Sequence, residues 1–396
     1  MRVRISTCVA LTITAISLLP QPQARAMAQA WEIYRGYKPE KVRALAGPGR
    51  AAGAVAFSPD GSSLIVGLDD GVVLRYDAAT GRQDGIFPAA ADHAPVHAIA
   101  FSPVGRMFAV ATPVPDPRAP NLATEVRSPG DAVSIRDQSG REVRKLSLMA
   151  GQIIVVAFAA DGKRVAAMDH TYGVKVWQVA DGREVIDSQV HRANGRQPSS
   201  AASRAGFSAD LTRAVVLNDA TDVDFGEAAR GNAVRLWEAG VPEPRVIPMN
   251  SRLPLSSVVI TGDGSRVFTS VDYHITMIHE FATIRHLGMG SEQIPRSVPA
   301  ESRRVTFLAL SPDNRRIVEG TKGGFVCVND LESKKGGHLL FEGPRGYVRA
   351  VSFLPDGVRI ASGGWEPLGG AYDAPRELDH TYYEPIMLWE VKGDGT

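Results

Sequence analysis

After residue 50 the chain is built from short stretches in which apolar and polar positions alternate. One such stretch places Val96, Ala98 and Ala100 two residues apart. A period of two is typical of a β-strand that buries one face. A second apolar run follows each alternating stretch, as in Leu64-Ile65-Val66, and a third ends in a bulky residue, as in Val174-Lys175-Val176-Trp177. The pattern therefore predicts short strands joined by tight turns.

One six-residue segment recurs between the first and second strands of this pattern. Its Pro-Asp-Gly core favours a tight turn, because Pro presets φ and Gly accepts a positive φ. Successive copies begin 44, 57, 49, 53, 50 and 43 residues apart. The seven copies are AFSPDG from Ala56, AFSPVG from Ala100, AFAADG from Ala157, GFSADL from Gly206, VITGDG from Val259, ALSPDN from Ala309 and SFLPDG from Ser352.

Four strands in about 40–50 residues, repeated seven times, indicate a β-propeller. Three of the third strands end in tryptophan, at Trp177, Trp237 and Trp389. A turn of SPDG type followed by a strand of VRLW type resembles the WD-repeat family, and the resemblance covers residues 41–396. It implies an all-β fold: a seven-bladed propeller of four-stranded antiparallel blades.

The sequence departs from the family's pattern at two places. The other four blades end their third strand in Tyr76, Arg136, His279 and Asn329 instead of tryptophan. The family's Gly-His dipeptide is essentially absent, and His93 is the best match to it. We therefore expect the buried Ser/His/Asp/Trp hydrogen-bond network of that family to be incomplete in most blades.

The last blade lacks a fourth strand of its own. Only seven residues follow Trp389, too few for a turn and a strand, whereas residues 41–46 form a strand-like run that belongs to no blade. We predict that this N-terminal run supplies the outer strand of the last blade. Such pairing removes two exposed sheet edges and closes the ring. Residues 29–40 are then a lead-in to a propeller over residues 41–396.

The first 28 residues have the layout of a secretory signal peptide. Arg2 and Arg4 precede a mostly apolar run at 5–19, and small-residue cleavage sites follow, after Ala26 or Ala28. The apolar run is short for a membrane span, which needs about 20 residues. An uncleaved anchoring helix is the alternative. We expect cleavage and export to the periplasm or the exterior of a bacterial cell.

Charge and cysteine content narrow the class of partner. The chain has 44 basic and 43 acidic residues, and removal of residues 1–28 would lower the basic count to 41. This balance argues against a nucleic-acid binder that works through its overall field.

Cys327 would be the single remaining cysteine, which excludes an internal disulfide. No further stretch of 18 apolar residues exists, so we expect no stable membrane insertion after cleavage.

Insertions in the repeat fall on one face of the predicted ring. From the start of each six-residue segment to the end of strand three, blades 1, 3, 5 and 6 use 20 residues, whereas blades 2, 4 and 7 use 36, 31 and 37. Two further insertions lie between blades 3 and 4 and between blades 5 and 6. In an up-and-down blade, the connection between strands two and three and the connection from strand four to the next strand one leave the same face. Insertions in repeat proteins often mark the binding face. Unselected drift in loop length is the alternative.

The blade 7 insertion has the composition of a recognition surface, because aromatic side chains are mixed with charged ones. Packing of these aromatics against the ring, to hold a long loop, is the alternative. The predicted partner-binding residues are Trp365, Tyr372, Asp373, His380, Tyr382 and Tyr383.

The other insertions differ in chemistry. The blade 4 insertion contains four acids between Asp219 and Glu227, which could bind Ca²⁺ or could simply form a solvated acidic loop. Its spacing does not match a full calcium-loop signature. The blade 2 insertion is rich in proline, and the segment between blades 3 and 4 is basic. Acidic and basic sectors side by side suit a protein partner better than a polyanion.

No catalytic motif stands out in the sequence. HExxH, GxSxG, P-loop and CxxC patterns are absent, and His97 and His170 read as turn or rim residues. Cys327 lies in an apolar strand and reads as core packing. We predict a monomeric, non-enzymatic platform that binds a protein partner without a cofactor. The alternative is a small-ligand-binding or enzymatic propeller with its site at the mouth of the central channel.

Overall fold

In the structure, a computed structural model, the described residues are all-β apart from one turn of 3-10 helix at Ala300–Arg303. It describes residues 40–44, 52–89, 94–104, 106–114, 130–189, 204–218, 233–241, 244–249, 255–271, 274–279, 283–287, 300–332, 338–342, 347–365 and 387–390. The signal-peptide prediction, the acidic segment from Asp219 to Glu227 and most of the blade 7 insertion lie outside these residues.

The described strands pair into seven four-stranded antiparallel sheets. The first sheet along the chain consists of β2 (Ala52–Phe57), β3 (Ser63–Leu68), β4 (Val72–Asp77) and β5 (Gln83–Pro88), and the second of β6 (Ala98–Phe101), β7 (Met107–Pro113), β8 (Asp131–Asp137) and β9 (Glu142–Lys145). The third consists of β10 (Ile153–Phe158), β11 (Arg164–Asp169), β12 (Gly173–Gln178) and β13 (Glu184–Gln189), and the fourth of β14 (Ala205–Phe207), β15 (Arg213–Asn218), β16 (Ala233–Glu238) and β17 (Arg245–Pro248).

The remaining three sheets follow the same strand order, except that one of them takes its outer strand from the N-terminal side of the chain. They are β18 (Val258–Ile260), β19 (Arg266–Val271), β20 (His274–His279) and β21 (Thr283–Leu287); β22 (Val305–Leu310), β23 (Arg316–Thr321), β24 (Phe325–Asp330) and β25 (His338–Glu342); and β26 (Tyr347–Phe353), β27 (Arg359–Trp365) and β28 (Met387–Glu390) with β1 (Glu40–Ala44).

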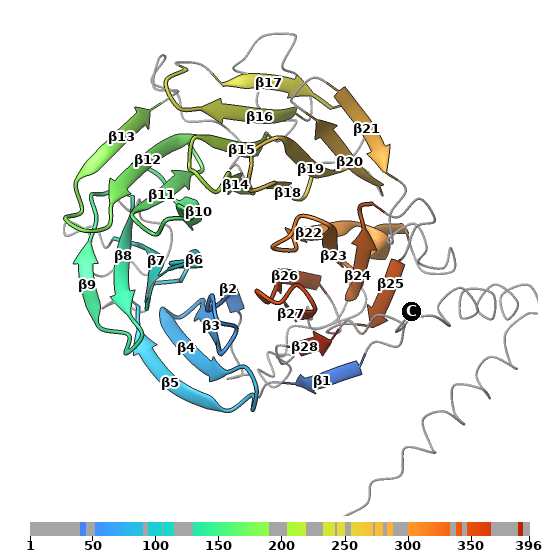
Figure 1. The fold of residues 1–396 in the computed structure, drawn as a ribbon, viewed down its shortest axis with the longest axis horizontal. Coiled ribbons are helices and arrows are strands. Elements are labelled where there is room, and N and C mark those ends of the chain that lie inside the picture. The colour runs from blue at the N-terminus through green and yellow to red at the C-terminus, as the bar shows by residue number, and fades with distance from the viewer. Residues whose placement is uncertain are drawn as a thin grey trace, which may run out of the picture.

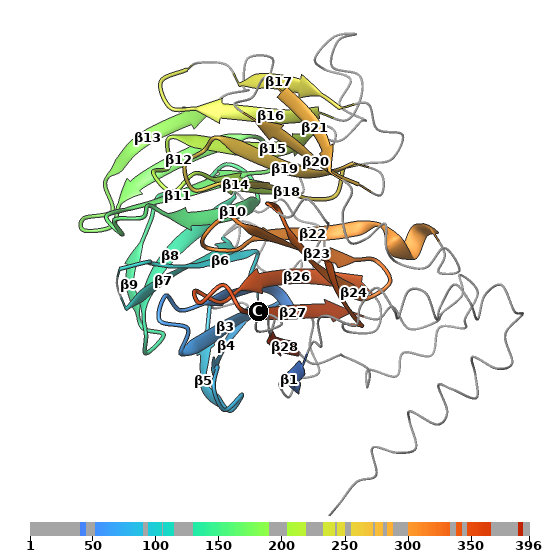
Figure 2. The same ribbon diagram turned by 45° about the vertical axis from the view of Figure 1, so that its right-hand side comes forward.

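The sheets stand around a central axis as the blades of a propeller (Figure 1). The first strand of each sheet is innermost, and it contacts the first strand of the next sheet; β26 likewise contacts β2. β1 pairs antiparallel with β28, so that Lys41 lies opposite Trp389. The turned view shows the sheets packed face to face with strongly twisted strands (Figure 2). The predicted all-β propeller of four-stranded antiparallel blades is confirmed.

The turn between the first two strands of a blade needs a residue with positive φ, which is why the repeat places Gly there. Gly61 has φ 67° and donates its backbone N–H to the Ser58 carbonyl at 2.8 Å. Two blades accept the same conformation without glycine, since Leu211 has φ 58° and Asn314 has φ 57°. The turn geometry therefore survives where its preferred residue is lost, although αL backbone is strained for leucine.

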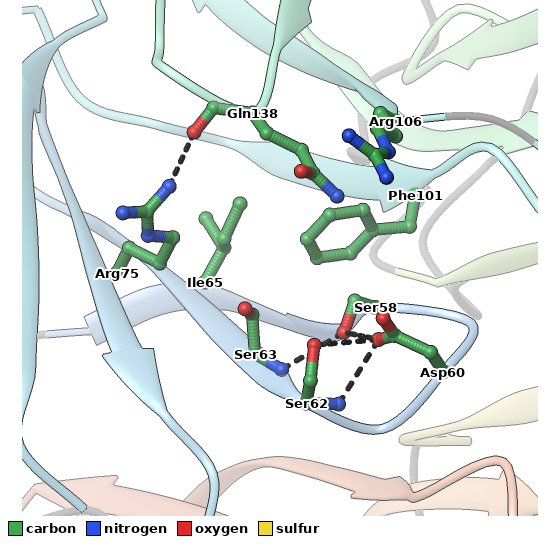
Figure 3. A pocket seen from close by; sticks show the side chains of 9 residues that line it. All are labelled: Ser58, Asp60, Ser62, Ser63, Ile65, Arg75, Phe101, Arg106 and Gln138. Carbon is green, nitrogen blue, oxygen red and sulfur yellow. Dashed lines mark hydrogen bonds between the residues drawn. The ribbon is translucent and has the colours of Figure 1, made fainter.

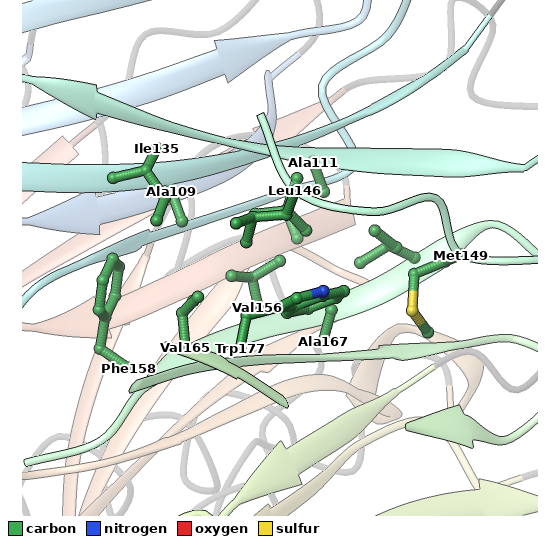
Figure 4. Packing of buried hydrophobic residues seen from close by; sticks show 13 residues of the cluster. Ala109, Ala111, Ile135, Leu146, Met149, Val156, Phe158, Val165, Ala167 and Trp177 are labelled. Atoms are coloured by element: carbon green, nitrogen blue, oxygen red, sulfur yellow. The ribbon is translucent and has the colours of Figure 1, made fainter. Parts of the chain in front are cut away.

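The core is distributed between neighbouring blades rather than gathered in one centre. Trp177 of β12 is fully buried and packs among Leu146 and Met149, which belong to the preceding blade, and Val156 of its own blade (Figure 4). Similar clusters join other adjacent sheets. Each blade thus completes the hydrophobic face of the next, as expected of a repeat unit that cannot bury its own face alone.

Where tryptophan is missing from the end of strand three, other side chains hold the same place. Tyr76 is 1% exposed, and the Arg136 side chain bridges to the previous blade, donating to the Pro88 and Ala89 carbonyls at 2.9 and 2.8 Å. Burial lowers the pKa of the Arg136 guanidinium from its ordinary value. A buried arginine that bonds backbone carbonyls can therefore replace an aromatic ring at this junction.

Candidate functional site

The predicted partner-binding residues fall almost entirely outside the described residues. Trp365 is the last residue of β27, and its side chain is not among the described ones. Tyr372, Asp373, His380, Tyr382 and Tyr383 lie in the segment between β27 and β28, which the structure does not describe. Whether these side chains come together therefore remains a prediction.

The described strands do bring the two ends of the longer segments close together. Pro113 lies opposite Asp131, and the next residue, Val114, donates its N–H to the Gly130 carbonyl at 3.0 Å. Asn218 lies opposite Ala233 in the same way. In an antiparallel blade all second-to-third strand connections leave the same face. That face is called the insertion face below.

Two histidines on the insertion face have structural partners. His97 Nδ1 lies 2.7 Å from Asp131 Oδ2, and the same carboxylate oxygen accepts the backbone N–H of Ile153 at 2.7 Å. His170 Nδ1 accepts the Gln152 N–H at 2.8 Å. These bonds tie strand ends within and between neighbouring blades, which confirms the rim role predicted for both histidines.

Cys327 is a core residue and not a nucleophile. The thiol is fully buried in β24, opposite Glu319 of β23. Burial, together with the Glu319 carboxylate, raises the pKa of the Cys327 thiol well above its ordinary value. Because the thiolate is the reactive form, this environment suppresses its chemistry.

The opposite face, called the turn face, carries a repeated hydrogen-bond motif. In the first blade, Ser58 Oγ donates to Asp60 Oδ1 at 2.6 Å, and Ser62 donates its N–H and hydroxyl to the same oxygen at 3.0 and 2.7 Å. Equivalent bonds join Ser208 to Asp210 and Ser311 to Asp313. Each of these three turns thus holds a carboxylate with several hydrogen-bond donors at the edge of its blade.

These bonds keep the turn carboxylates ionised. The hydroxyl of Ser58, followed by the N–H of Ser62, lowers the pKa of Asp60 to about 2. The hydroxyl of Thr261 does the same for Asp263, whose pKa is also about 2. Hydrogen bonds to the charged form account for the direction of both shifts. The turn face therefore carries fixed negative charges at neutral pH.

Arginines connect these turns around the ring. The residue that opens strand two is arginine in five consecutive blades, and its guanidinium reaches toward the turn of the next blade. Four such contacts are hydrogen bonds to turn carbonyls: Arg164 to Asp210 at 3.2 Å, Arg213 to Gly264 at 3.4 Å, Arg266 to Asn314 at 3.3 Å and Arg316 to Gly357 at 3.3 Å. The fifth, Arg359, lies beside Gly61.

The crevice between the β2–β5 and β6–β9 blades departs from this arrangement. Ser63 opens strand two there, and a side chain of its length cannot reach the next turn. A cavity of about 230 Å³ occupies this crevice (Figure 3). We call it the turn-face pocket; it is lined by Ser58, Asp60, Ser62, Ser63, Ile65, Arg75, Phe101, Arg106 and Gln138.

A second departure shapes the same pocket. Arg75 stands one residue before the end of strand three, where the other six repeats all have an aliphatic residue. Its Nε donates to Asp84 Oδ1 at 2.7 Å, and its Nη1 donates to the Gln138 carbonyl of the next blade. Arg75 thus spans the outer part of the crevice and leaves the inner part open.

The sequence reasoning missed this pocket, although its signal was present. The seven repeats, when superposed by their turns, show Ser63 where five blades have arginine and Arg75 where six have Ile, Val or Leu. Both changes point toward the same neighbouring blade. Neither substitution changes the length of a loop, so the pocket has no counterpart among the inserted segments.

In the described part of the chain, no group of three or more His, Cys, Asp or Glu side chains is placed to hold a metal ion. No helix among the described residues is long and apolar enough to cross a membrane.

Comparison with known proteins supports the fold assignment. The family model "WD domain, G-beta repeat" matches residues 337–366, which span β25, β26 and β27. No curated protein matches the sequence. The matched segment runs from the outer strand of one blade into the first two strands of the next. The matched repeat and the propeller arrangement of four-stranded sheets together support a WD-repeat β-propeller.

Proposed function

We propose that the protein is an exported, non-enzymatic platform that binds a protein partner through the insertion face. WD-repeat propellers are commonly protein-interaction scaffolds, which supports the general role. The observation that carries the finer proposal is the pairing of strand ends at Pro113 with Asp131 and at Asn218 with Ala233. A rigid strand pair that holds both ends of a long segment lowers the entropy lost when that segment binds.

The ring is proposed to be a closed propeller of seven blades. Its support is the seven four-stranded sheets, the contacts of each first strand with the next, and the pairing of β1 with β28. Closure of this kind removes exposed sheet edges, which are otherwise sites of aggregation. It also makes both ends of the ring necessary for its integrity.

The binding anchors are proposed to be Trp365, Tyr372, Tyr382 and Tyr383, with Asp373 and His380 as polar contacts. Aromatic side chains dominate the energetics of protein interfaces because they bury a large area with few rotatable bonds. The charged neighbours in the same segment would orient the partner. The protein is proposed to act as a monomer.

The place of action is proposed to be the periplasm or the exterior of a bacterial cell. The support is the order of basic, apolar and small residues at 1–28. A reporter enzyme fused after residue 30 tests this directly. Export of the reporter, and its retention when Arg2, Arg4 and the apolar run are replaced, is the expected result. A reporter that stays in the cytoplasm would refute it.

The platform itself is tested by affinity capture from the envelope fraction. The full protein is compared with a variant that carries Trp365→Ala and Tyr383→Ala, and thermal unfolding of both is measured. We expect one partner to be captured by the full protein and lost with the variant, at unchanged unfolding temperature. If the variant unfolds early, the aromatics pin the segment to the ring, and the proposal of binding anchors fails. If both proteins capture the same set, the partner binds elsewhere.

A further inference from the structure

The turn-face pocket lies at the position where five other blades direct an arginine toward the next turn, whereas the β6–β9 blade has Met107 there. Five blades place their own arginine at the start of strand two, and four of these bond a carbonyl of the next turn. Ser63 removes that side chain from one blade, and the vacated space is the cavity of about 230 Å³. The pocket therefore has the position of an arginine site without the arginine.

The turn carboxylate in this pocket also differs from three of its counterparts, although Asp210 resembles it in having only hydroxyl and N–H partners. Arg359 Nε donates to Asp356 Oδ2 at 2.7 Å, and the charges of Arg266 and Arg316 act on the aspartates of their own turns. Within the described residues Asp60 forms no ion pair; its partners are Ser58 and Ser62, whose three hydrogen bonds all end on Oδ1. The second oxygen of Asp60 takes no part in these bonds.

The remaining lining suits a planar cation better than an anion. Arg75 is neutralised by Asp84 at 2.7 Å and is held by the Gln138 carbonyl, so its charge is already compensated. Arg106 is exposed, and its side chain makes no hydrogen bond or ion pair within the described residues. Asp60 and Arg106 are thus both uncompensated charges of the lining, and of the two only Asp60 is held in place by hydrogen bonds.

Size and surface chemistry agree with this assignment. A cavity of about 230 Å³ falls below the range of about 300–1,000 Å³ that small-molecule pockets usually occupy, so it fits one side-chain group. The Phe101 ring and the Ile65 side chain form the apolar part of the lining (Figure 3). An aromatic face attracts a guanidinium, and its neighbouring hydroxyls and carboxylate can accept the N–H groups.

We propose that the turn-face pocket recognises the guanidinium group of an arginine side chain from a partner polypeptide, which occupies the place that the chain's own arginine occupies in five other blades. Asp60 Oδ2 accepts from the guest guanidinium, Phe101 stacks on it, and the Ser63 hydroxyl completes the set of acceptors. The site lies on the face opposite the insertions and does not depend on the platform proposed above.

The test uses the full-length protein and N-acetyl-arginine N-methylamide as probe, with binding followed by ligand-observed NMR. The neutral analogue of the same shape, N-acetyl-citrulline N-methylamide, is the ligand control. The two test variants are Ser63→Arg, which supplies the missing side chain, and Asp60→Asn, which keeps the Oδ1 acceptor and removes the charge. Val246→Arg is the protein control, because it adds the same charge at an exposed position of β17.

We expect the arginine probe to bind the native protein and Val246→Arg equally. Ser63→Arg and Asp60→Asn should each weaken binding about tenfold or more, since a charge-assisted hydrogen bond is lost. Because the pKa of Asp60 is about 2, affinity should not change with pH near neutrality. Equal binding of citrulline, or unchanged arginine binding to Ser63→Arg, would overturn the proposal. Binding of methyl phosphate that disappears in Arg106→Ala, without arginine binding, would identify an anion site instead.

Discussion

Two crevices between blades can be compared: one follows the β22–β25 blade and the other follows the β2–β5 blade. The turn beside each crevice has the same hydrogen bond from serine to aspartate. Ser311 donates to Asp313 in one as Ser58 donates to Asp60 in the other. In the first crevice Arg316 crosses to the Gly357 carbonyl at 3.3 Å, whereas in the second Ser63 leaves a cavity. The turn is thus maintained by bonds within one repeat, and the seam between repeats depends on a single longer side chain.

The two crevices are also fastened differently at their outer parts. Arg136 and Arg75 join the β2–β5 and β6–β9 blades near the outer strands, through bonds to Pro88, Ala89 and Gln138. At the position of Arg136 three blades have tryptophan, and at the position of Arg75 the other six blades have an aliphatic residue. The loss of an inner arginine is therefore accompanied by two outer ones, so the seam can be open on the turn face without separating.

The largest expected effect on stability comes from removing the Arg136 hydrogen bonds that join the outer strands of the first two blades. Arg136→Ala removes a buried cation that bonds the Pro88, Ala89 and Gly140 carbonyls and leaves these acceptors unpaired. We expect the free energy of unfolding to fall by about 3 kcal/mol. Urea unfolding measures it. Arg141→Ala, at an exposed position of the same blade, is the control and should change stability by less than about 0.5 kcal/mol. Equal losses in both variants would contradict the fastening role.

The next largest effect is expected from a substitution that removes the arginine crossing the crevice after the β22–β25 blade. Arg316→Ser copies the situation of Ser63, and it should cost about 1 kcal/mol, because one partly exposed hydrogen bond and its packing are lost. The exposed neighbour Arg315→Ser serves as the matched control and should cost less. The same urea titration compares them. The Arg316→Ser variant should also bind a second equivalent of the arginine probe in the opened crevice. If no second equivalent binds, removal of the arginine is not sufficient to create a binding site.

The reverse change closes the pocket. Ser63→Arg should raise the free energy of unfolding by about 0.5 kcal/mol, since it adds a bridge of the kind seen from Arg213 to the Gly264 carbonyl. Thermal unfolding of the variant beside Val246→Arg distinguishes this gain from a general effect of charge. A loss of stability larger than that of the control would mean that the crevice cannot accept the side chain.

The smallest effect concerns the acid limb of stability. Asp263 has a folded pKa of about 2, below its ordinary 3.8, because the Thr261 hydroxyl bonds its charged form. Its contribution is therefore complete above the ordinary pKa and is lost as the pH falls through the folded one. Asp263→Asn should flatten the decline of stability between these two values. Asp60→Asn should do the same to a similar extent, since the Ser58 hydroxyl and the Ser62 N–H lower the pKa of Asp60 to about 2 as well.

Much of the fold could be predicted because its determinants are local. Alternation of apolar residues marks strands, and a Pro-Asp-Gly turn fixes where they reverse, so the all-β class, the four-strand repeat and the turns follow from adjacent residues. The same reasoning identified His97, His170 and Cys327 as structural. It also stated that the family's tryptophan network would be incomplete, and the structure places Arg136 at one of those positions.

The candidate binding residues show the limit of that reasoning. Trp365 and the aromatics after it were chosen by composition, and no contact among described residues bears on them. The turn-face pocket was missed because its lining comes from two blades. Arg75 meets Gln138, and Ser63 faces the blade that begins with β6, only after the sheets take their angle around the axis.

The sequence by itself determined the repeat: where each strand begins, where the chain turns, and which side chains bond within one turn. These interactions span a few residues, so neighbouring positions suffice to specify them. Only the tertiary structure decided which residues face each other across blades, such as Arg136 with Ala89 or Arg266 with Asn314. Those pairs lie nearly a whole repeat apart, and their contact depends on how twisted sheets stack around a ring.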